Sequence, residues 1–248
     1  WFAQSSGTTS DQFKWLPITS EALHECHYKG GKDLLAQFCN QVPAAQLYQG
    51  KHLILGGSSS LVRDGSHAMK GDLSAIIVRH LPPWCEARRT PSRDIALMDD
   101  WESKVEAIAE ATLVEDVRIL AGVPSWMSIV AQRVLEKSGK SNLREVWPNL
   151  WLYMHGGVGF APYRDTFSHL IPDLPGHPPM HYLETYNASE GFFAYQDDLS
   201  RDDMALLMDH GIYYEFMPLD HLGNPNPSAL EFREVEEGQT YALVVSTN

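Results

Sequence analysis

Short runs of apolar residues alternate along the chain with longer stretches in which apolar side chains recur every three or four positions. The short runs are typical of buried strands, and the longer spacing is typical of amphipathic helices. The predicted strands are 52–55, 75–78, 117–120, 150–154, 182–185, 212–218 and 240–247. The predicted helices are 18–38, 94–112, the segment from Gly122-Val-Pro-Ser125 to Gly139, and 163–170. Strands that alternate with helices predict an α/β fold.

Some of these segments carry more detail than others. The clearest helix, 94–112, has apolar residues in 3-4-3 spacing, whereas Gly30-Gly31 weakens the helix predicted at 18–38. The helix that ends at Gly139 predicts one apolar stripe, made of Trp126, Ile129, Val130, Val134 and Leu135. Residues 58–74 are rich in Ser, Gly and His and predict a loop. The last two strands are expected to pair across the loop that carries Asn224-Pro-Asn-Pro227.

Composition narrows the classes of function. The 248 residues suffice for one large domain or two modest ones, and 44% of them are hydrophobic, as in globular proteins. The net charge of −13 argues against a nucleic acid partner, because duplex binding needs basic patches. The chain lacks an apolar run long enough to span a bilayer, so no membrane partner is expected. Three widely spaced cysteines favour a reduced, cytoplasmic location.

The first motif that could bind a ligand is Ser5-Ser6-Gly7-Thr8-Thr9-Ser10, followed by Lys14. Glycine lets backbone amides approach an anion, hydroxyls donate to phosphate oxygens, and a lysine compensates the charge. The spacing of the Walker P-loop is absent. Two interpretations therefore stay open, a phosphate-binding loop and an ordinary Ser/Thr-rich turn.

The second motif is Glu184-Thr185-Tyr186-Asn187-Ala188-Ser189-Glu190-Gly191, at the end of a predicted strand. Open α/β sheets bind ligands at the carboxyl ends of their strands, and one carboxylate such as Glu190 can join phosphate oxygens around Mg²⁺. The alternative is the start of a helix, with Asn187 or Ser189 as its cap.

The third motif is His155-Gly156-Gly157-Val158-Gly159, which also follows a strand. Its small residues would let a flat ring such as a nucleobase lie against the backbone, or they would only permit a tight bend.

Other candidates point to structural roles. His24 and His27 lack the HExxH spacing of a zinc site, and the chain has no GxSxG nucleophile elbow. Paired aspartates such as Asp99-Asp100 are typical of helix starts. The tryptophans at 101, 126, 147 and 151 are expected in the core, although one of them could wall an apolar substrate pocket.

The order of the motifs is more specific than any one of them. After the first motif the series continues with Gly122-Val-Pro-Ser-Trp126, Val146-Trp-Pro-Asn-Leu150, the third motif, then the second motif, Gly211-Ile-Tyr-Tyr-Glu-Phe216 and Tyr241-Ala-Leu-Val-Val-Ser-Thr247. This series resembles the Gretchen-Hagen (auxin-responsive) family of acyl-acid amido synthetases, and it looks closer to the bacterial members than to the plant ones.

The resemblance implies an α/β adenylate-forming fold of the acyl-CoA synthetase and luciferase type. It implies ATP and Mg²⁺ as cofactors, and a small-molecule carboxylic acid and an amino acid as partners. By similarity, the nucleotide-binding residues are Ser5, Ser6, Gly7, Thr8, Thr9, Lys14, Gly156, Gly157, Thr185, Tyr186, Ser189 and Glu190, with Glu190 also the Mg²⁺ ligand. The family's third nucleotide motif matches from Tyr241 onward.

The resemblance also implies an extent. Residues 1–248 would form the central part of the large N-terminal adenylation domain, and the third motif breaks off at Asn248. The family's ribose-binding aspartate and its small C-terminal domain would follow Asn248 and are not part of this chain. We therefore expect the segment alone to be inactive. In the family, an acid attacks the α-phosphate of ATP and the resulting adenylate is then attacked by an amine. The alternatives are a ligase that passes the acyl group to coenzyme A, and a nucleotide- or acyl-binding protein without turnover.

Overall fold

The computed structural model describes residues 1–5, 14–56, 62–64 and 68–247. Its largest sheet has seven strands in the order β11-β10-β9-β8-β7-β3-β6. Five of them run parallel: β6 (Arg89–Thr90), β3 (Lys51–Ile54), β7 (Val117–Ala121), β8 (Leu152–Gly156) and β9 (His181–Ala188). β10 (Gly191–Tyr195) and β11 (Ala205–Leu206) add an antiparallel edge. The predicted α/β class is confirmed.

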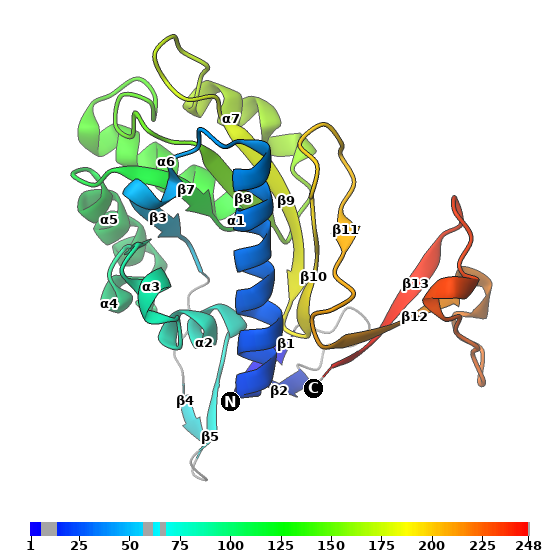
Figure 1. The fold of residues 1–248 in the computed structure, drawn as a ribbon. Helices are drawn as coiled ribbons and strands as arrows, with labels where there is room; N and C mark the ends of the chain where they lie inside the picture. The colour runs from blue at the N-terminus through cyan, green and yellow to red at the C-terminus, as the bar shows by residue number, and fades with distance from the viewer. Residues whose placement is uncertain (6–13, 57–61, 65–67, 248) are drawn as a thin grey trace.

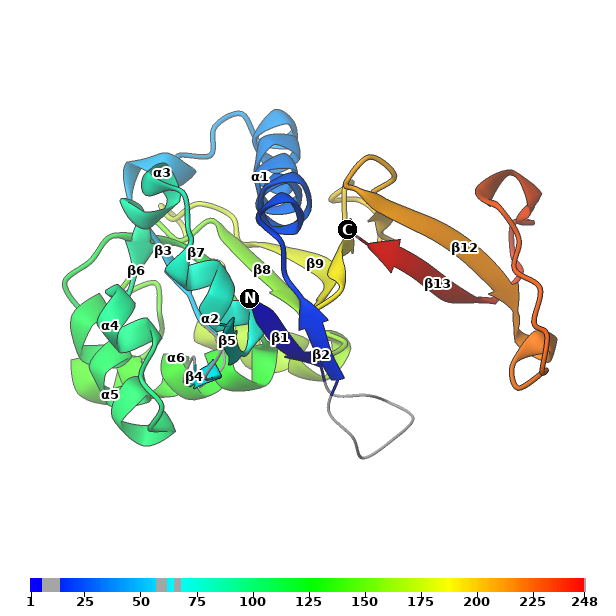
Figure 2. The same cartoon turned by 90° about the horizontal axis from the view of Figure 1, so that it is seen from below.

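Helices cover both faces of this sheet (Figures 1 and 2). On one face α1 (Lys29–Gln41) packs Leu34 and Phe38 against Ile119 and Leu152 of the sheet. The other face is covered by α5 (Trp101–Thr112), α6 (Pro124–Ser138) and α7 (Arg164–Leu170). β7 lies in the middle of the sheet, and Val117 to Leu120 are all buried. Its apolar run Ile119-Leu120-Ala121 is typical of a central parallel strand, and Arg118 before it pairs with the Asp116 carboxylate.

The remaining elements are short. A four-stranded sheet has the order β2-β1-β5-β4, with β1 at Phe2–Ser5, β2 at Lys14–Pro17, β4 at Val62–Asp64 and β5 at Ala68–Gly71. The short helices are η1 (Ala22–Tyr28), η2 (Leu47–Gln49), α2 (Leu73–Arg79), α3 (Pro83–Glu86), α4 (Arg93–Ala96), η3 (Ala161–Tyr163), η4 (Leu219–His221) and η5 (Phe232–Glu234). None of the helices in the described part of the chain has the length and hydropathy that a membrane crossing requires.

A two-stranded antiparallel sheet projects from the main body (Figures 1 and 2). It consists of β12 (Ile212–Pro218) and β13 (Tyr241–Thr247), which pair along their whole length. The predicted pairing of these two segments is confirmed. The sheet joins the body through a small cluster in which Ile212 and Tyr214 pack against Phe193 and Cys26.

Three predicted elements differ from the structure. The strand predicted at 75–78 is wrong: these residues lie in α2, whose start is capped by the Asp72 carboxylate accepting from the Ser74 amide at 3.3 Å. The helix predicted at 94–112 is two helices, α4 and α5, because Asp100 caps a new start by accepting from the Ser103 amide. The loop predicted at 58–74 contains β4, β5 and the start of α2 within its described part.

The first and third predicted helices need smaller corrections. The first begins at Ala22 as a π-helix and continues through α1 to Gln41. Its Gly30 has a packing reason, because a Cβ there would lie 2.7 Å from Cγ of Phe192. In α6 the predicted apolar stripe wrongly includes Trp126 and Ile129, whose side chains are 37% and 44% exposed. Met127 and Ala131, which the predicted stripe omits, are buried. Gly139 ends this helix in the left-handed region, as predicted.

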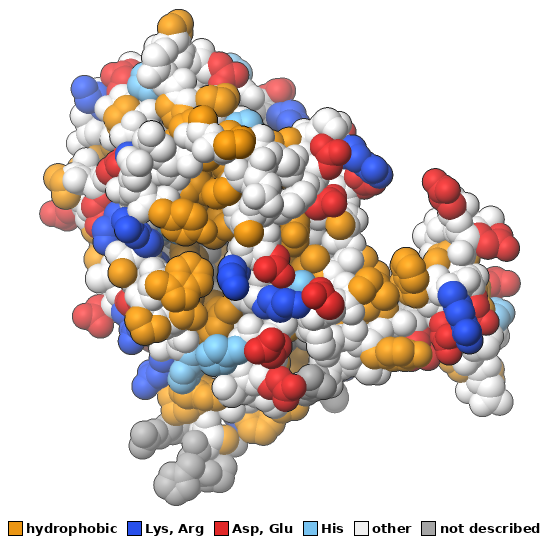
Figure 3. Space-filling view, in the orientation of Figure 1, with side chains coloured by type: hydrophobic (Ala, Val, Ile, Leu, Met, Phe, Trp, Pro, Cys, Tyr) orange, Lys and Arg blue, Asp and Glu red, His pale blue; other side chains and the backbone are white. Residues whose placement is uncertain are grey.

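One face of the surface appears in Figure 3. Acidic and basic side chains are intermixed over the main body there, and apolar side chains gather between them. The net charge of −13 is therefore not concentrated in one acidic patch on this face.

Candidate functional site

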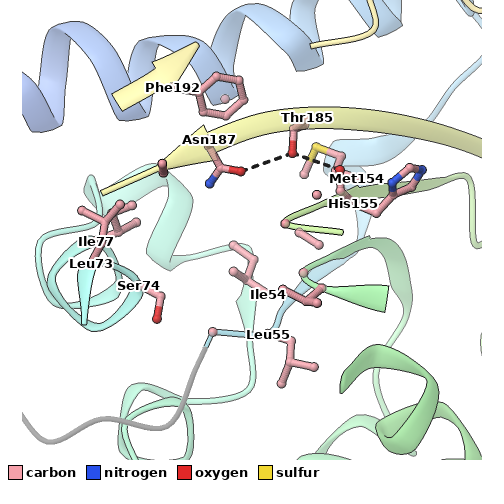
Figure 4. Close-up of a pocket in the computed structure, with 18 of the residues that line it drawn as sticks. Ile54, Leu55, Leu73, Ser74, Ile77, Met154, His155, Thr185, Asn187 and Phe192 are labelled. Carbon is pink, nitrogen blue, oxygen red and sulfur yellow. Dashed lines mark hydrogen bonds between the residues drawn. The ribbon is translucent and has the colours of Figure 1, made fainter. Parts of the chain in front are cut away.

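Four of the parallel strands end at one cavity of about 420 Å³. Residues at or just after the carboxyl ends of β3, β7, β8 and β9 line it, together with residues of α1, α2 and α6. Figure 4 shows side chains from these elements converging on the same space. Carboxyl ends of parallel strands are where open α/β sheets bind ligands, and the volume suits a small organic molecule.

The walls of the cavity are mostly apolar. Its apolar side chains are Leu34, Ile54, Leu55, Leu73, Ile77, Val78, Ala121, Val123, Trp126, Met154, Ala188 and Phe192. The polar residues of the lining are Asp72 and Ser74 on the α2 side, His155 on β8, and Thr185, Asn187 and Ser189 on the β9 side. Asp72 is the only Asp, Glu, Lys or Arg among the lining residues that the structure describes.

Two glycines allow the strand ends to approach one another. A Cβ on Gly156 would lie 2.5 Å from the carbonyl oxygen of Thr185, so β8 and β9 come too close there for any side chain. Gly122, at φ +147°, would place a Cβ 2.7 Å from the Leu55 carbonyl oxygen. The Tyr153 hydroxyl fixes this second turn by donating to the Gly122 carbonyl at 3.0 Å.

Thr185 and Asn187 project from the same face of β9, because strand residues two apart point the same way. The Thr185 hydroxyl donates to the His155 carbonyl on β8 at 3.0 Å and lies 3.4 Å from Oδ1 of Asn187. Figure 4 shows both contacts, with the Asn187 amide extending from β9 into the cavity.

A second group of polar residues lies beside the cavity, and we call Ser5, Lys14, Ser189 and Glu190 the polar edge. The Ser5 hydroxyl donates to the Glu190 carboxylate at 3.2 Å, and the Ser189 hydroxyl donates to the Gln4 carbonyl at 3.4 Å. Lys14 pairs in register with Ser5 across β1 and β2, and its side chain is exposed. Residues 185 positions apart in the sequence thus meet at hydrogen-bond distance.

The structure brings together most of the nucleotide-binding residues implied by the family resemblance. Gly156, Gly157, Thr185 and Ser189 line the cavity, and Ser189 also belongs to the polar edge together with Ser5, Lys14 and Glu190. Ser6, Gly7, Thr8 and Thr9 lie outside the described residues.

Tyr186 departs from this group. It is 47% exposed, faces the side of β9 opposite Thr185 and Asn187, and packs its ring 5.0 Å from that of Phe193.

The structure decides between some of the alternatives left open by the sequence. The helix start considered at Asn187 or Ser189 is wrong, since β9 continues to Ala188 and turns through Ser189 and Glu190 into β10. The bend considered at the third motif is present, because Gly157 has a φ of +80°.

Two buried basic groups lie at or beside the cavity. Burial lowers the pKa of His155 to about 4, and nearby Arg164 lowers it further, so the ring is neutral near pH 7. Its ring stacks on Phe160 at 4.0 Å between centroids. Burial also lowers the pKa of Lys104, against the opposing effects of Asp72 and Asp99, and its ammonium donates to the Gly56 carbonyl at 3.3 Å. His155 itself lines the cavity, and Lys104 contacts the lining residue Gly56.

Sequence reasoning missed several lining residues. Asn187 was considered only as a helix cap, although its position two residues after Thr185 on a strand would have placed both on one face. Trp126 fits the expectation that one tryptophan walls a pocket, and its ring lies 5.7 Å from that of Trp101. Leu73, Ser74 and Ile77 carry no sequence signal, because helix α2 was read as a strand and a loop.

Comparisons with solved structures show the same fold. The AtGH3.15 acyl acid amido synthetase in complex with 2,4-DB is 14% identical, with a TM-score of 0.73 over 99% of this chain and 50% of that one. A second structure, the GH3.15 acyl acid amido synthetase, is also 14% identical, with a TM-score of 0.72 and the same coverage. This chain therefore spans about half the length of the solved proteins it matches. A search of the curated proteins found no sequence match.

Comparison with family models identifies the family. The model described as the GH3 family N-terminal domain matches residues 1–176, and the model of the GH3 family central domain matches residues 205–248. Because the first match alone covers more than half of the chain, the chain belongs to the GH3 family.

Proposed function

We propose that the whole protein is an ATP-dependent acyl-acid amido synthetase, which adenylates a carboxylic acid and conjugates it to an amino acid. Family membership and the likeness to solved acyl acid amido synthetases support this reaction class. The observation that carries the proposal is the contact between Ser5 and Glu190 directly beside an apolar cavity. A phosphate site at the polar edge would then adjoin a site for an organic acid.

The apolar walls of the cavity suit the body of the acid, and the same cavity includes Gly156 and Gly157, which the family resemblance assigns to the nucleotide. Twelve of its side chains are apolar, and a ligand body placed there would be removed from water against Ile77, Trp126 and Met154. The acid would enter with its carboxylate toward Ser189, where the cavity meets the polar edge. This arrangement holds the attacking oxygen near the phosphates, which is a positioning task.

The polar edge suits the triphosphate of ATP. The exposed Lys14 ammonium is a donor of the kind that binds phosphate oxygens. The Ser5 hydroxyl lies opposite it on β1 and would donate to a phosphate oxygen in place of the Glu190 carboxylate. Donors and cations placed where charge develops lower the barrier of phosphoryl transfer. We assign Ser5 and Lys14 to the phosphates, and the segment between them, residues 6–13, lies outside the described residues.

Glu190 would hold Mg²⁺ at this edge. Among the described residues there is no cluster of three or more His, Cys, Asp or Glu side chains that could hold a metal ion. One carboxylate is nevertheless a sufficient protein contribution, because Mg²⁺ usually keeps water and phosphate oxygens as its other ligands. When bound there, the ion would neutralise charge on the transferring phosphoryl group. The residues present fit this mode of binding.

The titratable groups of the cavity are consistent with a site that binds the substrate and does not itself transfer protons. The amine of the amino acid must lose a proton when it attacks, yet a pKa lowered by burial to about 4 makes His155 a weak base, and its ring stacks on Phe160. The other titratable group of the lining, the Asp72 carboxylate, caps α2. We therefore do not assign His155 as the general base.

Pyrophosphate exchange tests the proposal. The full-length protein is incubated with ATP, Mg²⁺, labelled pyrophosphate and a panel of carboxylic acids, and labelled ATP is measured. We expect exchange that depends on the acid, and an amide product together with AMP when amino acids are added. Absence of acid-dependent exchange across the panel would reject the adenylation. Thioester formation in a mixture of coenzyme A and amino acids would instead assign the acceptor as coenzyme A.

We also propose a cytoplasmic location. All three cysteines are free, with Cys26 buried, as expected in a reducing compartment. Cell fractionation with an antibody against the protein tests this, and recovery in an oxidising compartment would contradict it.

A further inference from the structure

We propose that Asn187 determines which acids the cavity accepts. The expected substrate is a monocarboxylic acid whose neutral, mostly apolar body carries one hydrogen-bonding substituent, such as a hydroxyl group, that meets the Asn187 amide. This inference rests on the proposed function, because it names the class of acid that the same cavity takes.

The first step is the charge of the cavity. Asp72 is the only Asp, Glu, Lys or Arg of the described lining, and its carboxylate caps α2 by accepting from the Ser74 amide. The lining His155 has a pKa lowered by burial to about 4 and is therefore uncharged near pH 7. The remaining wall is mostly apolar. A second carboxylate on the acid would lose its hydration there without gaining a cation, and it would also share the space with Asp72. The body of the acid is therefore expected to carry no second negative charge.

The second step is the bonding capacity of Asn187. A threonine hydroxyl has a single hydrogen, and the shorter contact of Thr185, 3.0 Å to the His155 carbonyl, uses it. The 3.4 Å contact between Thr185 and Asn187 therefore satisfies at most one end of the amide. In either orientation of the amide, the other polar end faces the cavity from β9 (Figure 4).

The third step is the contrast between Asn187 and its surroundings. Across the cavity from β9 lie Leu73, Ile77 and Ile54, which offer no side-chain hydrogen bond (Figure 4). In an apolar cavity, a few polar groups fix the orientation of the ligand and discriminate between ligands. A ligand that covers the amide without bonding it leaves a desolvated polar group, whereas a hydroxyl can both donate and accept.

The experiment uses the full-length protein and matched acids. Hydroxybenzoic and methylbenzoic acids substituted at the same ring position differ in hydrogen bonding but little in size. Acid binding is measured by calorimetry, and kcat/KM is measured by pyrophosphate exchange. At the ring position that reaches Asn187, we expect the wild type to prefer the hydroxyl acid over the methyl acid by about three- to tenfold, the range of one hydrogen bond.

The variant Asn187→Leu removes the amide and keeps a similar volume. We expect it to lose or reverse the preference for the hydroxyl acid in both binding and kcat/KM. Asn40→Leu, the same change at an exposed position of α1, is the control and should keep the wild-type preference. Benzene dicarboxylic acids should bind at least about tenfold more weakly than benzoic acid, because a second charge is desolvated.

The outcomes separate this inference from the proposed function. If none of the acids supports exchange or binds, the proposed function fails and the inference fails with it. If acids support exchange but the wild type does not discriminate hydroxyl from methyl at any ring position, only the inference is overturned. It is also overturned if Asn187→Leu retains the wild-type preference. The wild-type comparison decides the matter even where the Asn187→Leu variant does not fold.

Discussion

The cavity and the polar edge meet at Ser189, yet they are built in opposite ways. The cavity takes most of its walls from parallel strands and helices whose backbones are fixed by the sheet and the core behind it. The polar edge comes from a turn and from the ends of two strands of the smaller sheet, and it is held by side-chain hydrogen bonds. An apolar body is thus recognised by shape, whereas phosphates are recognised by individual donors. Substitutions in the two regions should therefore affect different substrates.

The largest difference between the effects on the two regions is expected from Glu190→Gln. This variant removes the negative charge of the polar edge but keeps the size of the side chain. We expect acid-dependent pyrophosphate exchange to fall by about 10²–10³-fold, as when one preorganised electrostatic group is lost. Acid binding measured by calorimetry should stay unchanged. Glu237→Gln, at an exposed position before β13, serves as the control. A parallel loss of acid binding would show that the two regions are not separate.

The next effect is expected from Gly156→Ala, which tests whether the cavity depends on the close approach of β8 and β9. The new Cβ would lie 2.5 Å from the Thr185 carbonyl oxygen, so the strands must part. Chemical denaturation should show a loss of about 1–3 kcal/mol in the free energy of unfolding. Gly159→Ala is the matched control, because a Cβ there meets nothing within 4 Å. Equal stability of the two variants would contradict the packing argument.

A smaller effect is expected from Trp126→Ala, which removes a large part of the apolar wall. The dissociation constant for the acid should rise about tenfold, since roughly 1–2 kcal/mol of apolar contact is lost. The KM for ATP should change by less than about twofold, because the loss is uniform and distant from the phosphates. Trp84→Ala, at a 48% exposed position on α3, controls for loss of an indole elsewhere. A rise in the KM for ATP alone would place Trp126 with the nucleotide.

The smallest effect is expected from Ser5→Ala at the polar edge. Its hydroxyl donates one hydrogen bond to Glu190 at 3.2 Å in a partly buried setting. Loss of one such bond should raise the KM for ATP by about three- to tenfold and leave acid binding as it is. Titration of ATP at saturating acid measures this. An unchanged KM would remove Ser5 from the phosphate site.

The two regions also differ in how far the sequence predicts them. The alternation of strands and helices predicts the main sheet, because buried central strands such as β7 need apolar runs. The order of the motifs predicts which residues gather at the polar edge, and Ser5 and Glu190 do meet. The contact itself is not readable from local pattern, because the two residues are 185 positions apart.

The cavity was harder to predict for physical reasons. Its wall includes Leu73 and Ile77, and the apolar pattern around them is equally compatible with a strand and with a helix. The segment forms a helix whose first turn is capped by the Asp72 carboxylate. Trp126 was expected in the buried stripe of α6, but it faces the cavity, and a concave surface leaves no periodicity in the sequence. Polar residues with a specific hydrogen-bonding role are more visible in a sequence than the apolar surface they adjoin.

The position of Trp126 has an optical consequence. Its indole lines the cavity and is 37% exposed, whereas that of Trp147 is fully buried and donates to the Thr112 carbonyl at 2.9 Å. A ligand that fills the cavity would displace water from Trp126 and leave the surroundings of Trp147 unchanged. Tryptophan emission should therefore shift to shorter wavelength when an acid binds, before any bond is made. The molecule carries its own fluorescent reporter for the acid, separate from every readout that depends on ATP.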